Sequence, residues 1–389
     1  MKGLKWASVF VLIVLLSGCW DSVELDESIM VVGVGISKQD DEYQIIFEAI
    51  TPSEINPDEM TVEGESTLLQ TKGSTLFDAA REIIRIAKRR LFFTHAEVWI
   101  IHNELASEED MLLFLDVLRR EQMLRLNSFL FISNDEPAEI FTSDFTFSNI
   151  LSEELISGIE FNEYVSDYPA VRARDFFKRL LSPLRTGYLP TIQTTKQNEK
   201  VLSQLSGSAI FKKGKMVGVL NPSESSGLKW LNNEVHGGNI TVKVGDSAAS
   251  FKLINGNMGL ETQLQGDKLT VDIDIKAEGS LADQIIQVNS LDEWIDKFKD
   301  KVNQSIKADI HKALQKLQKE YKTDATLIGL ETYRKQPDQF NQVQDKWDDV
   351  FAEATIHIHV DTVINNKGLI DSPGYQFPEQ KQRNPHQKK

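Results

Sequence analysis

The sequence predicts an α+β protein of about three domains, with mixed or antiparallel sheets and one long helix near the C-terminal end. Three observations predict this class. The chain has 389 residues, more than one typical domain of roughly 100–200 residues. It is 41% hydrophobic and 26% charged, which suits globular domains with buried cores. Apolar positions repeat with a period of two in some segments and about 3.6 in others, so both strands and helices are expected.

The first predicted elements are two strands and a helix. Residues 29–36 have the composition of a buried strand, and residues 43–50 follow as its hairpin partner. Ser74 or Thr75 can cap the helix, because a hydroxyl oxygen accepts a free N–H group of the first turn. The positions that repeat at helical spacing and should face the core are Leu76, Phe77, Ala80, Ile83, Ile84 and Ala87.

The same alternation continues to the end of the first predicted domain, residues 19–185. Ser107 and Asp110 make a capping-box pattern that opens a helix through about Leu118. The other segments are a strand at 98–101, a strand at 127–133 and an amphipathic helix at 171–181 that Pro183 ends.

A β-rich middle domain is expected over residues 186–256. Residues 185–200 are polar with Gly and Pro at their start, which indicates a linker. Strand patterns follow at 207–211, 216–220, 240–244 and 250–254. The first two are joined through Gly214, as in a tight hairpin.

The third predicted domain, residues 257–370, combines strands with the long helix. Residues 268–277 alternate apolar and polar side chains, as in a half-solvated sheet. Ser290 and Glu293 form a second capping box ahead of about 30 helical residues, roughly 45 Å at 1.5 Å each. The apolar stripe of this helix is Trp294, Phe298, Val302, Ile306, Ile310, Leu314, Leu317 and Tyr321. A last strand is expected at 351–364, and the polar tail 371–389 is expected to be disordered.

The N-terminus has the pattern of an export signal. Lys2 and Lys5 precede about eleven apolar residues, fewer than the roughly 20 that a transmembrane helix needs. Leu16-Ser17-Gly18-Cys19 resembles the bacterial lipobox. That resemblance implies removal of residues 1–18 and attachment of S-diacylglycerol and an N-acyl chain at Cys19, which would anchor the mature protein to a membrane.

Composition excludes two other classes. A single cysteine cannot make a disulfide framework. With 43 Lys and Arg against 58 Asp and Glu, the net charge is −15, and nucleic-acid binding normally needs a basic face.

Two histidine-containing clusters are candidates for a catalytic or metal site. His357 and His359 share one face of a predicted strand, but a zinc site needs further ligands. His95 and Glu97 could form an acid–base pair, yet no nucleophile motif accompanies them. An exposed polar strand face is the preferred interpretation of the first, and a buried polar contact of His95 that of the second. We therefore predict no catalytic residues, no metal and no cofactor.

One basic cluster stands out in the acidic chain. Arg81, Arg85 and Lys88 lie on one stripe of the predicted helix at 76–87. They either form a solvated face or contact an acidic partner loop or phospholipid headgroups. Glu224, which follows the expected hairpin over residues 207–220, is the other candidate for a partner contact.

Several segments together resemble the Ger(x)C family, the lipoprotein C subunit of bacterial spore germinant receptors. The matching segments are Cys19-Trp20-Asp21, residues 30–36, residues 90–97, residues 207–211, Gly218-Val219-Leu220, Glu224, Gly227 and Trp230-Leu231.

The resemblance implies three α+β domains on the outer face of the spore inner membrane. It also implies two integral-membrane partners, an A-type and a B-type subunit, and a non-catalytic role in assembling or signalling with them. A lipid-anchored solute-binding protein of a transporter is the alternative, which the hairpin-rich second half and the long helix disfavour.

Overall fold

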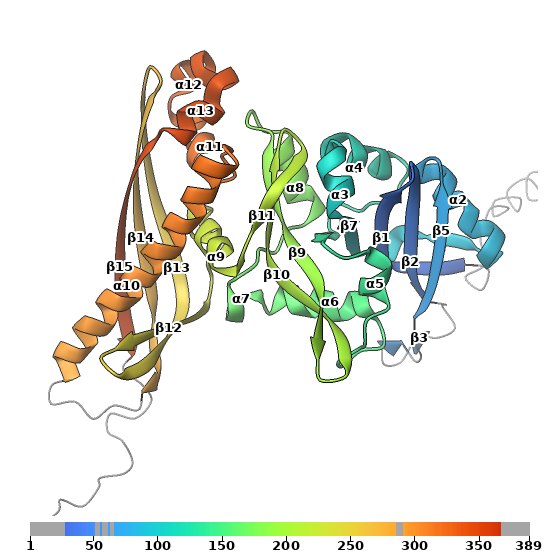
Figure 1. Cartoon of the computed structure of the whole chain (residues 1–389), viewed down its shortest axis with the longest axis horizontal. Helices are drawn as coiled ribbons and strands as arrows, with labels where there is room; N and C mark the ends of the chain where they lie inside the picture. The colour runs from blue at the N-terminus through green and yellow to red at the C-terminus, as the bar shows by residue number, and fades with distance from the viewer. Residues whose placement is uncertain (1–27, 51–54, 57–60, 63–65, 285–290, 367–389) are drawn as a thin grey trace, which may run out of the picture. The chain divides into compact units, whose positions relative to one another are not determined.

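The computed structural model describes residues 28–50, 55–56, 61–62, 66–284 and 291–366 (Figure 1). Cys19, Ser290 and the tail 371–389 lie outside the described residues. The chain divides into two compact units. The first comprises Met1–Glu160 and Tyr168–Asn221, and the second comprises Phe161–Asp167 and Pro222–Lys389.

The first unit is built on a mixed nine-stranded sheet in the order β11-β10-β9-β8-β7-β1-β2-β5, with β6 paired to β1. The pairs β1–β7, β7–β8, β8–β9 and β1–β6 are parallel, and the others are antiparallel. The strands are β1 Ser28–Gln39, β2 Glu42–Ile50, β5 Thr67–Gly73, β6 Arg90–Phe92, β7 Val98–His102, β8 Phe129–Ser133, β9 Thr186–Gln197, β10 Lys200–Lys212 and β11 Lys215–Leu220. A separate short ribbon pairs β3 Ile55–Asn56 with β4 Thr61–Val62.

Helices flank this sheet (Figure 1). They are α2 Leu76–Ala87, α3 Asn103–Glu108, α4 Met111–Arg120, α5 Pro137–Phe141, α6 Leu151–Glu160 and α8 Ala173–Leu180, with a 3₁₀ turn at Phe93–His95. Strands β7 and β8 are buried along their whole length. Continuous apolar runs are what a parallel strand with both faces covered requires.

A buried carboxylate connects β2 to α6. Glu48 has no exposed surface, and its oxygens accept hydrogen bonds from the backbone N–H of Leu151 at 2.7 Å and of Ser152 at 2.9 Å. The hydroxyls of Ser66 and Ser152 also donate to it. Glu48 thereby satisfies N–H groups that a helix start leaves free, and its charge lies at the positive end of the helix dipole.

The close approach of α6 explains a glycine in β1. A Cβ at Gly33 would lie 2.2 Å from the Ser152 hydroxyl oxygen and 2.8 Å from the Phe141 ring. Only glycine leaves room for the helix start to come this near to β1. Gly33 in β1 therefore permits the close approach of α6, and Glu48 in β2 binds the start of the same helix.

The β1–β2 hairpin, Thr75 as the cap of α2 and the β10–β11 hairpin are confirmed. Two expectations in this unit were wrong, namely the cap of α4 and the burial of Phe77 and Ile84. Asp110, not Ser107, caps α4, because the Asp110 carboxylate accepts from Leu112 N at 3.0 Å while Ser107 lies inside α3. Thr75 is the cap of α2. Phe77 and Ile84 are 43% and 50% exposed, since α2 turns Leu76, Ala79 and Ile83 toward the sheet instead.

The structure also divides the chain at other places than residues 185 and 256. The expected linker at 185–200 is mostly strand β9, which pairs with β8 and carries β10 and β11 into the first sheet. The physical reason is that backbone hydrogen bonds to β8 and β10 hold β9 inside the sheet, where its first seven residues are buried, and polar composition does not prevent such pairing.

The second unit has a four-stranded sheet in the order β12-β13-β14-β15, with β14 and β15 parallel. Its strands are β12 Gly238–Val244, β13 Ser247–Gln265, β14 Lys268–Gln284 and β15 Thr355–Asn366. Its helices are α7 Asn162–Val165, α9 Pro222–Leu231, α10 Leu291–Gln315, α11 Ile328–Lys335, α12 Pro337–Val343 and α13 Trp347–Ala352. A π-helical turn at Lys316–Glu320 extends α10, and a 3₁₀ turn at Gln344–Lys346 precedes α13.

The long helix is confirmed. Helix α10 has 25 residues, and the π-helical turn adds five. It packs against β12 and β15 and runs beside the sheet (Figure 1). The buried stripe includes Phe298, Val302, Ile306, Ile310, Leu314 and Leu317, as the helical spacing predicts.

A second buried carboxylate organises the crossover from α10 to β15. Asp324 is fully buried and accepts from Thr326 N at 3.0 Å, from Gly329 N at 2.7 Å and from the Trp347 indole N–H at 3.1 Å. Burial raises the pKa of Asp324, and these hydrogen bonds oppose the rise. Asp324 therefore fixes the start of α11 and ties α13 to it.

A buried amine holds the short segment 161–167 within the second unit. Lys229 on α9 is 3% exposed, and its Nζ donates to Asn162 Oδ1 at 2.5 Å and to Ser166 Oγ at 3.4 Å. Burial lowers the pKa of Lys229 from 10.5 to about 8, although the carboxylates of Glu234 and Asp167 act in the opposite direction. The amine is thus tied to α7 at an energetic cost to its charged form.

The Glu48 carboxylate should be a major source of stability in the first unit. We expect Glu48→Gln to lower the free energy of unfolding by about 1–3 kcal/mol, because an amide cannot replace every acceptor and removes the charge at the helix start. Urea unfolding measures the change. Glu160→Gln, at the exposed C-terminal end of the same helix, is the control and should change stability by less than about 0.5 kcal/mol. Equal effects of the two substitutions would contradict this role.

Lys229 should make stability depend on alkaline pH. Between about pH 8 and pH 10.5 the unfolded chain binds a proton that folded Lys229 has released, so the free energy of unfolding rises with pH across this range. Between neutral pH and about pH 10, the free energy of unfolding of the wild type should increase by about 2–3 kcal/mol more than that of Lys229→Met. Urea unfolding of both proteins at several pH values tests this. Parallel pH profiles would show that Lys229 keeps an ordinary pKa.

Candidate functional site

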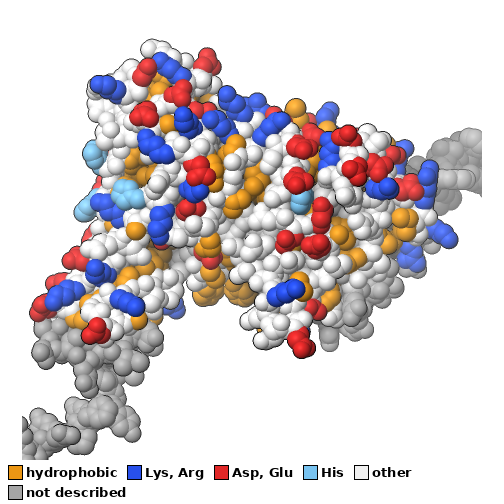
Figure 2. Space-filling model, in the orientation of Figure 1, with side chains coloured by type: hydrophobic (Ala, Val, Ile, Leu, Met, Phe, Trp, Pro, Cys, Tyr) orange, Lys and Arg blue, Asp and Glu red, His pale blue; other side chains and the backbone are white. Residues whose placement is uncertain are grey.

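The basic candidates lie on α2 of the first unit. Arg81, Arg85 and Lys88 are all exposed, Lys88 being the residue that caps the helix with a left-handed backbone. Phe77 and Ile84 lie on the same side, because positions 77, 81, 84 and 88 recur at helical spacing. Figure 2 shows Lys and Arg side chains, with hydrophobic ones beside them, at the edge of the first unit where α2 lies in Figure 1.

Contacts within this face leave most of its charge accessible. Arg85 forms an ion pair with Glu82 at 3.0 Å, and its side chain is 81% exposed. The Arg81 guanidinium lies 4.1 Å from the centre of the Phe77 ring. Within the part of the chain that the structure describes, no ion pair involves Arg81 or Lys88. An arginine stacked on an exposed phenylalanine forms a combined apolar and cationic surface.

The other candidate, Glu224, lies on α9 of the second unit and is only 9% exposed. Helix α9 packs closely on α10, since a Cβ at Gly227 would lie 2.1 Å from the backbone oxygen of Asp309. The Ser223 hydroxyl donates to the Asp309 carboxylate, and Lys312 Nζ donates to Ser223 at 2.8 Å. Glu224 therefore lies in a helix–helix packing region, and its role in a partner contact stays a prediction.

The remaining family-pattern residues on α9 are core residues. Trp230 is 3% exposed and Leu231 fully buried, which confirms their expected place. Lys229, directly before Trp230, was not among the residues expected to matter. A lysine inside an otherwise apolar run, Leu228-Lys229-Trp230-Leu231, is the signal that could have indicated a buried charge.

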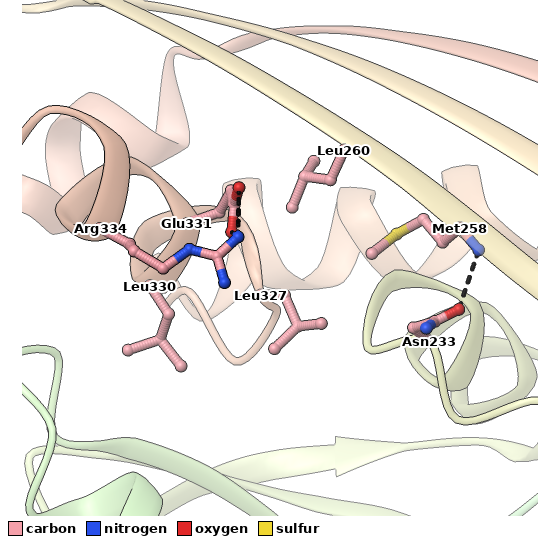
Figure 3. Close-up of a pocket in the computed structure, with 7 residues that line it drawn as sticks. All are labelled: Asn233, Met258, Leu260, Leu327, Leu330, Glu331 and Arg334. Carbon is pink, nitrogen blue, oxygen red and sulfur yellow. Dashed lines mark hydrogen bonds and ion pairs between the residues drawn. The ribbon is translucent and has the colours of Figure 1, made fainter.

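A hollow of about 420 Å³ lies in the second unit between β13, α11 and the end of α9. Figure 3 shows its lining, with Leu260, Leu327 and Leu330 around a charged pair. Arg334 contacts Glu331 at 2.6 Å, and Lys335 contacts it at 3.1 Å. Burial alone would raise the pKa of Glu331, but the hydrogen bonds from Lys335 and Arg334 outweigh it and lower the pKa. The carboxylate in this hollow is therefore held as one partner of a charge network.

The histidine clusters do not assemble a site among the described residues. His357 and His359 are exposed on one face of β15, and His95 and Glu97 are also exposed, so the buried contact expected for His95 was wrong. His102 is the buried histidine of that region, at 7% exposure. Within the described ranges, no group of three or more His, Cys, Asp or Glu side chains is arranged to hold a metal ion.

Cys19 lies outside the described residues, so the predicted anchor is not tested by the structure. None of the described helices combines the length and the apolar character needed to cross a bilayer.

Comparisons with known proteins point to one family. The model "Spore germination protein N-terminal domain" matches residues 21–194, and "Spore germination B3/GerAC like, C-terminal" matches residues 206–368. Spore germination protein B3 of Bacillus subtilis is 23% identical over 94% of this chain and 98% of its own. Spore germination protein KC of the same organism is 24% identical over 93% and 95%.

A solved structure supports the fold. The crystal structure of the GerBC protein matches with a TM-score of 0.59 over 86% of this chain and 97% of its own, at 18% identity. Two family models in sequence order and a shared fold over nearly the whole chain agree with the resemblance seen in the motifs. The chain belongs to the spore germination GerAC/B3-like family.

Proposed function

We propose that this chain is a non-catalytic, lipid-anchored subunit of a nutrient germinant receptor that supports assembly or signalling of the membrane subunits in spore germination. The observation that carries the proposal is the match of two spore germination models, in order, to residues 21–194 and 206–368. The curated relatives B3 and KC match over more than nine-tenths of both chains, so the likeness is not confined to one domain.

In this proposal Cys19 attaches the protein to the outer face of the spore inner membrane. The thiol carries a diacylglycerol, and the amine freed by cleavage before Cys19 carries a further acyl chain. Each buried CH₂ contributes about 0.8 kcal/mol, and one chain alone holds only marginally, so two or three chains make a lasting anchor. The acidic body, with a net charge of −15, adds no general attraction to an anionic membrane.

The partners in this proposal are two integral-membrane subunits, of the A-type and the B-type. A role in contact rather than in catalysis fits the polar groups of the described residues. The buried carboxylates Glu48 and Asp324 are engaged by helix N–H groups, and Glu331 is engaged by two basic side chains. These groups stabilise the fold, and none of them is positioned as a free acid or base.

Acylation of Cys19 is the first test. We expect mass spectrometry of the membrane fraction to find the wild-type chain beginning at an acylated Cys19. Cys19→Ala should stay uncut and unacylated, because the thiol is the lipid attachment point. Ser17→Ala is the control, since it keeps a small residue before the cleavage point and should still be acylated. An unmodified Cys19 in wild-type membranes would refute the anchor.

The second test separates a receptor subunit from a solute-binding protein. We expect the purified full-length chain to bind amino acids, sugars and nucleosides too weakly for calorimetry, while it co-purifies with the two membrane subunits. The hollow beside Glu331 offers apolar walls and an already paired charge, which is a poor site for a small polar nutrient. A dissociation constant near 1 μM, about −8 kcal/mol, for any nutrient would favour the transporter alternative.

A further inference from the structure

One exposed face of the first unit combines features that the fold does not use. We define the α2 face as Phe77, Arg81, Ile84, Arg85 and Lys88. Its two apolar members are 43% and 50% exposed, although both were expected in the core. The side of the helix that packs on the sheet is a different one and carries the buried residues Leu76, Ala79 and Ile83.

The arrangement of these side chains is typical of a helix that lies on a lipid surface. Basic and apolar residues alternate along one side: Phe77, Arg81, Ile84 and Lys88 are spaced by four, three and four positions, with Arg85 next to them. Long basic side chains can place their charge at headgroup level while their stems and the neighbouring apolar groups enter the acyl boundary. The stacking of Arg81 on Phe77 already brings one such pair together.

The length of the chain limits how far this face can lie from the proposed anchor. Strand β1 begins at Ser28, which pairs with Arg90 of β6 just after the end of α2. Ser28 is nine residues after Cys19, and nine residues span at most about 32 Å in any conformation. Helix α2 itself is about 18 Å long. If Cys19 is held in a membrane, the whole α2 face is therefore within reach of that membrane.

Charge favours an anionic surface for this contact. The chain as a whole carries −15, so most of its surface is repelled by anionic lipid. The α2 face supplies three basic residues, with Arg89 and Arg90 following directly, and the Glu82 partner of Arg85 offsets one charge. Each Lys or Arg close to an anionic membrane strengthens binding roughly five-fold.

We propose that the α2 face docks on the anionic phospholipid surface of the membrane that carries this protein, and so fixes the orientation of the first unit against the bilayer. The proposal rests on the lipid anchor of the proposed function and adds a second, non-covalent membrane contact. It commits to lipid as the occupant, and an acidic segment of a membrane subunit is the competing occupant that the experiment tests.

The single cysteine makes a site-specific test possible. Because acylation consumes the Cys19 thiol, Ile84→Cys introduces one free thiol for an environment-sensitive fluorophore. The labelled, acylated full-length chain is reconstituted into vesicles of phosphatidylglycerol and phosphatidylethanolamine, without other subunits. Leu181→Cys is the matched control, since Leu181 is a 70% exposed leucine at the end of α8. Helix α8 packs on β9, whereas α2 packs on β5, and strands β8, β7, β1 and β2 lie between β9 and β5 in the sheet.

We expect lipids with brominated acyl chains to quench the label at position 84 and not the label at position 181. Quenching should fall at high salt and in vesicles of phosphatidylcholine alone. Reversing Arg81, Arg85 and Lys88 to Glu should lower the equilibrium constant of docking by about 100-fold or more. Circular dichroism checks that each variant is folded.

Two outcomes would overturn the proposal. The first is equal quenching at positions 84 and 181 in acylated protein. The second is quenching or protection at position 84 that needs the membrane subunits, which would assign the α2 face to a protein partner. Failure of the anchor itself is read separately, by mass spectrometry of Cys19 in the same preparation. The Cys19→Ala, Ile84→Cys double variant then repeats the quenching measurement without any acyl chain.

Discussion

The carboxylate of Glu48, buried at the start of helix α6, is the interaction on which the first unit depends most. A buried charge is stable only if it is fully hydrogen-bonded, and here two helix N–H groups and two serine hydroxyls supply the donors. The arrangement fixes α6 on the sheet, and Gly33 gives it room to approach. The parallel strands β7 and β8 can then be covered on both faces, which their apolar sequences require.

The second unit uses the same principle with different groups. Asp324 connects α11 to α13 by accepting from the backbone N–H of Gly329 and from the indole N–H of Trp347. Lys229 connects α9 to the short segment 161–167. Glu48 and Asp324 lie at helix starts, where backbone N–H groups would otherwise be left without partners, whereas Lys229 donates to the side chains of Asn162 and Ser166. Charge in this protein is therefore divided between a few buried groups that organise the fold and an exposed surface that meets the surroundings.

Much of the order of elements could be predicted, and the failures arise where the path of the backbone or its pairing with a distant strand decides the structure. Hairpins β1–β2 and β10–β11 and the long helix α10 follow from local periodicity and turn residues. The cap of α4 was assigned to Ser107 because two polar residues at suitable spacing precede the helix, and only the backbone path selects Asp110. The segment at 185–200 looked like a linker because polar composition does not reveal a strand whose contribution is its backbone hydrogen bonds.

The sequence by itself determined the family resemblance, the lipobox pattern at Cys19 and the presence of a basic stripe on the helix at 76–87. These are properties of consecutive residues or of one helical period, so no tertiary contact is needed to recognise them. Only the tertiary structure decided that Glu48, Lys229 and Asp324 are buried, and that Phe77 and Ile84 stay exposed beside Arg81. Burial depends on which side of a helix or strand meets a distant segment, and a helix with apolar residues on a wide arc can turn either edge of that arc to the core.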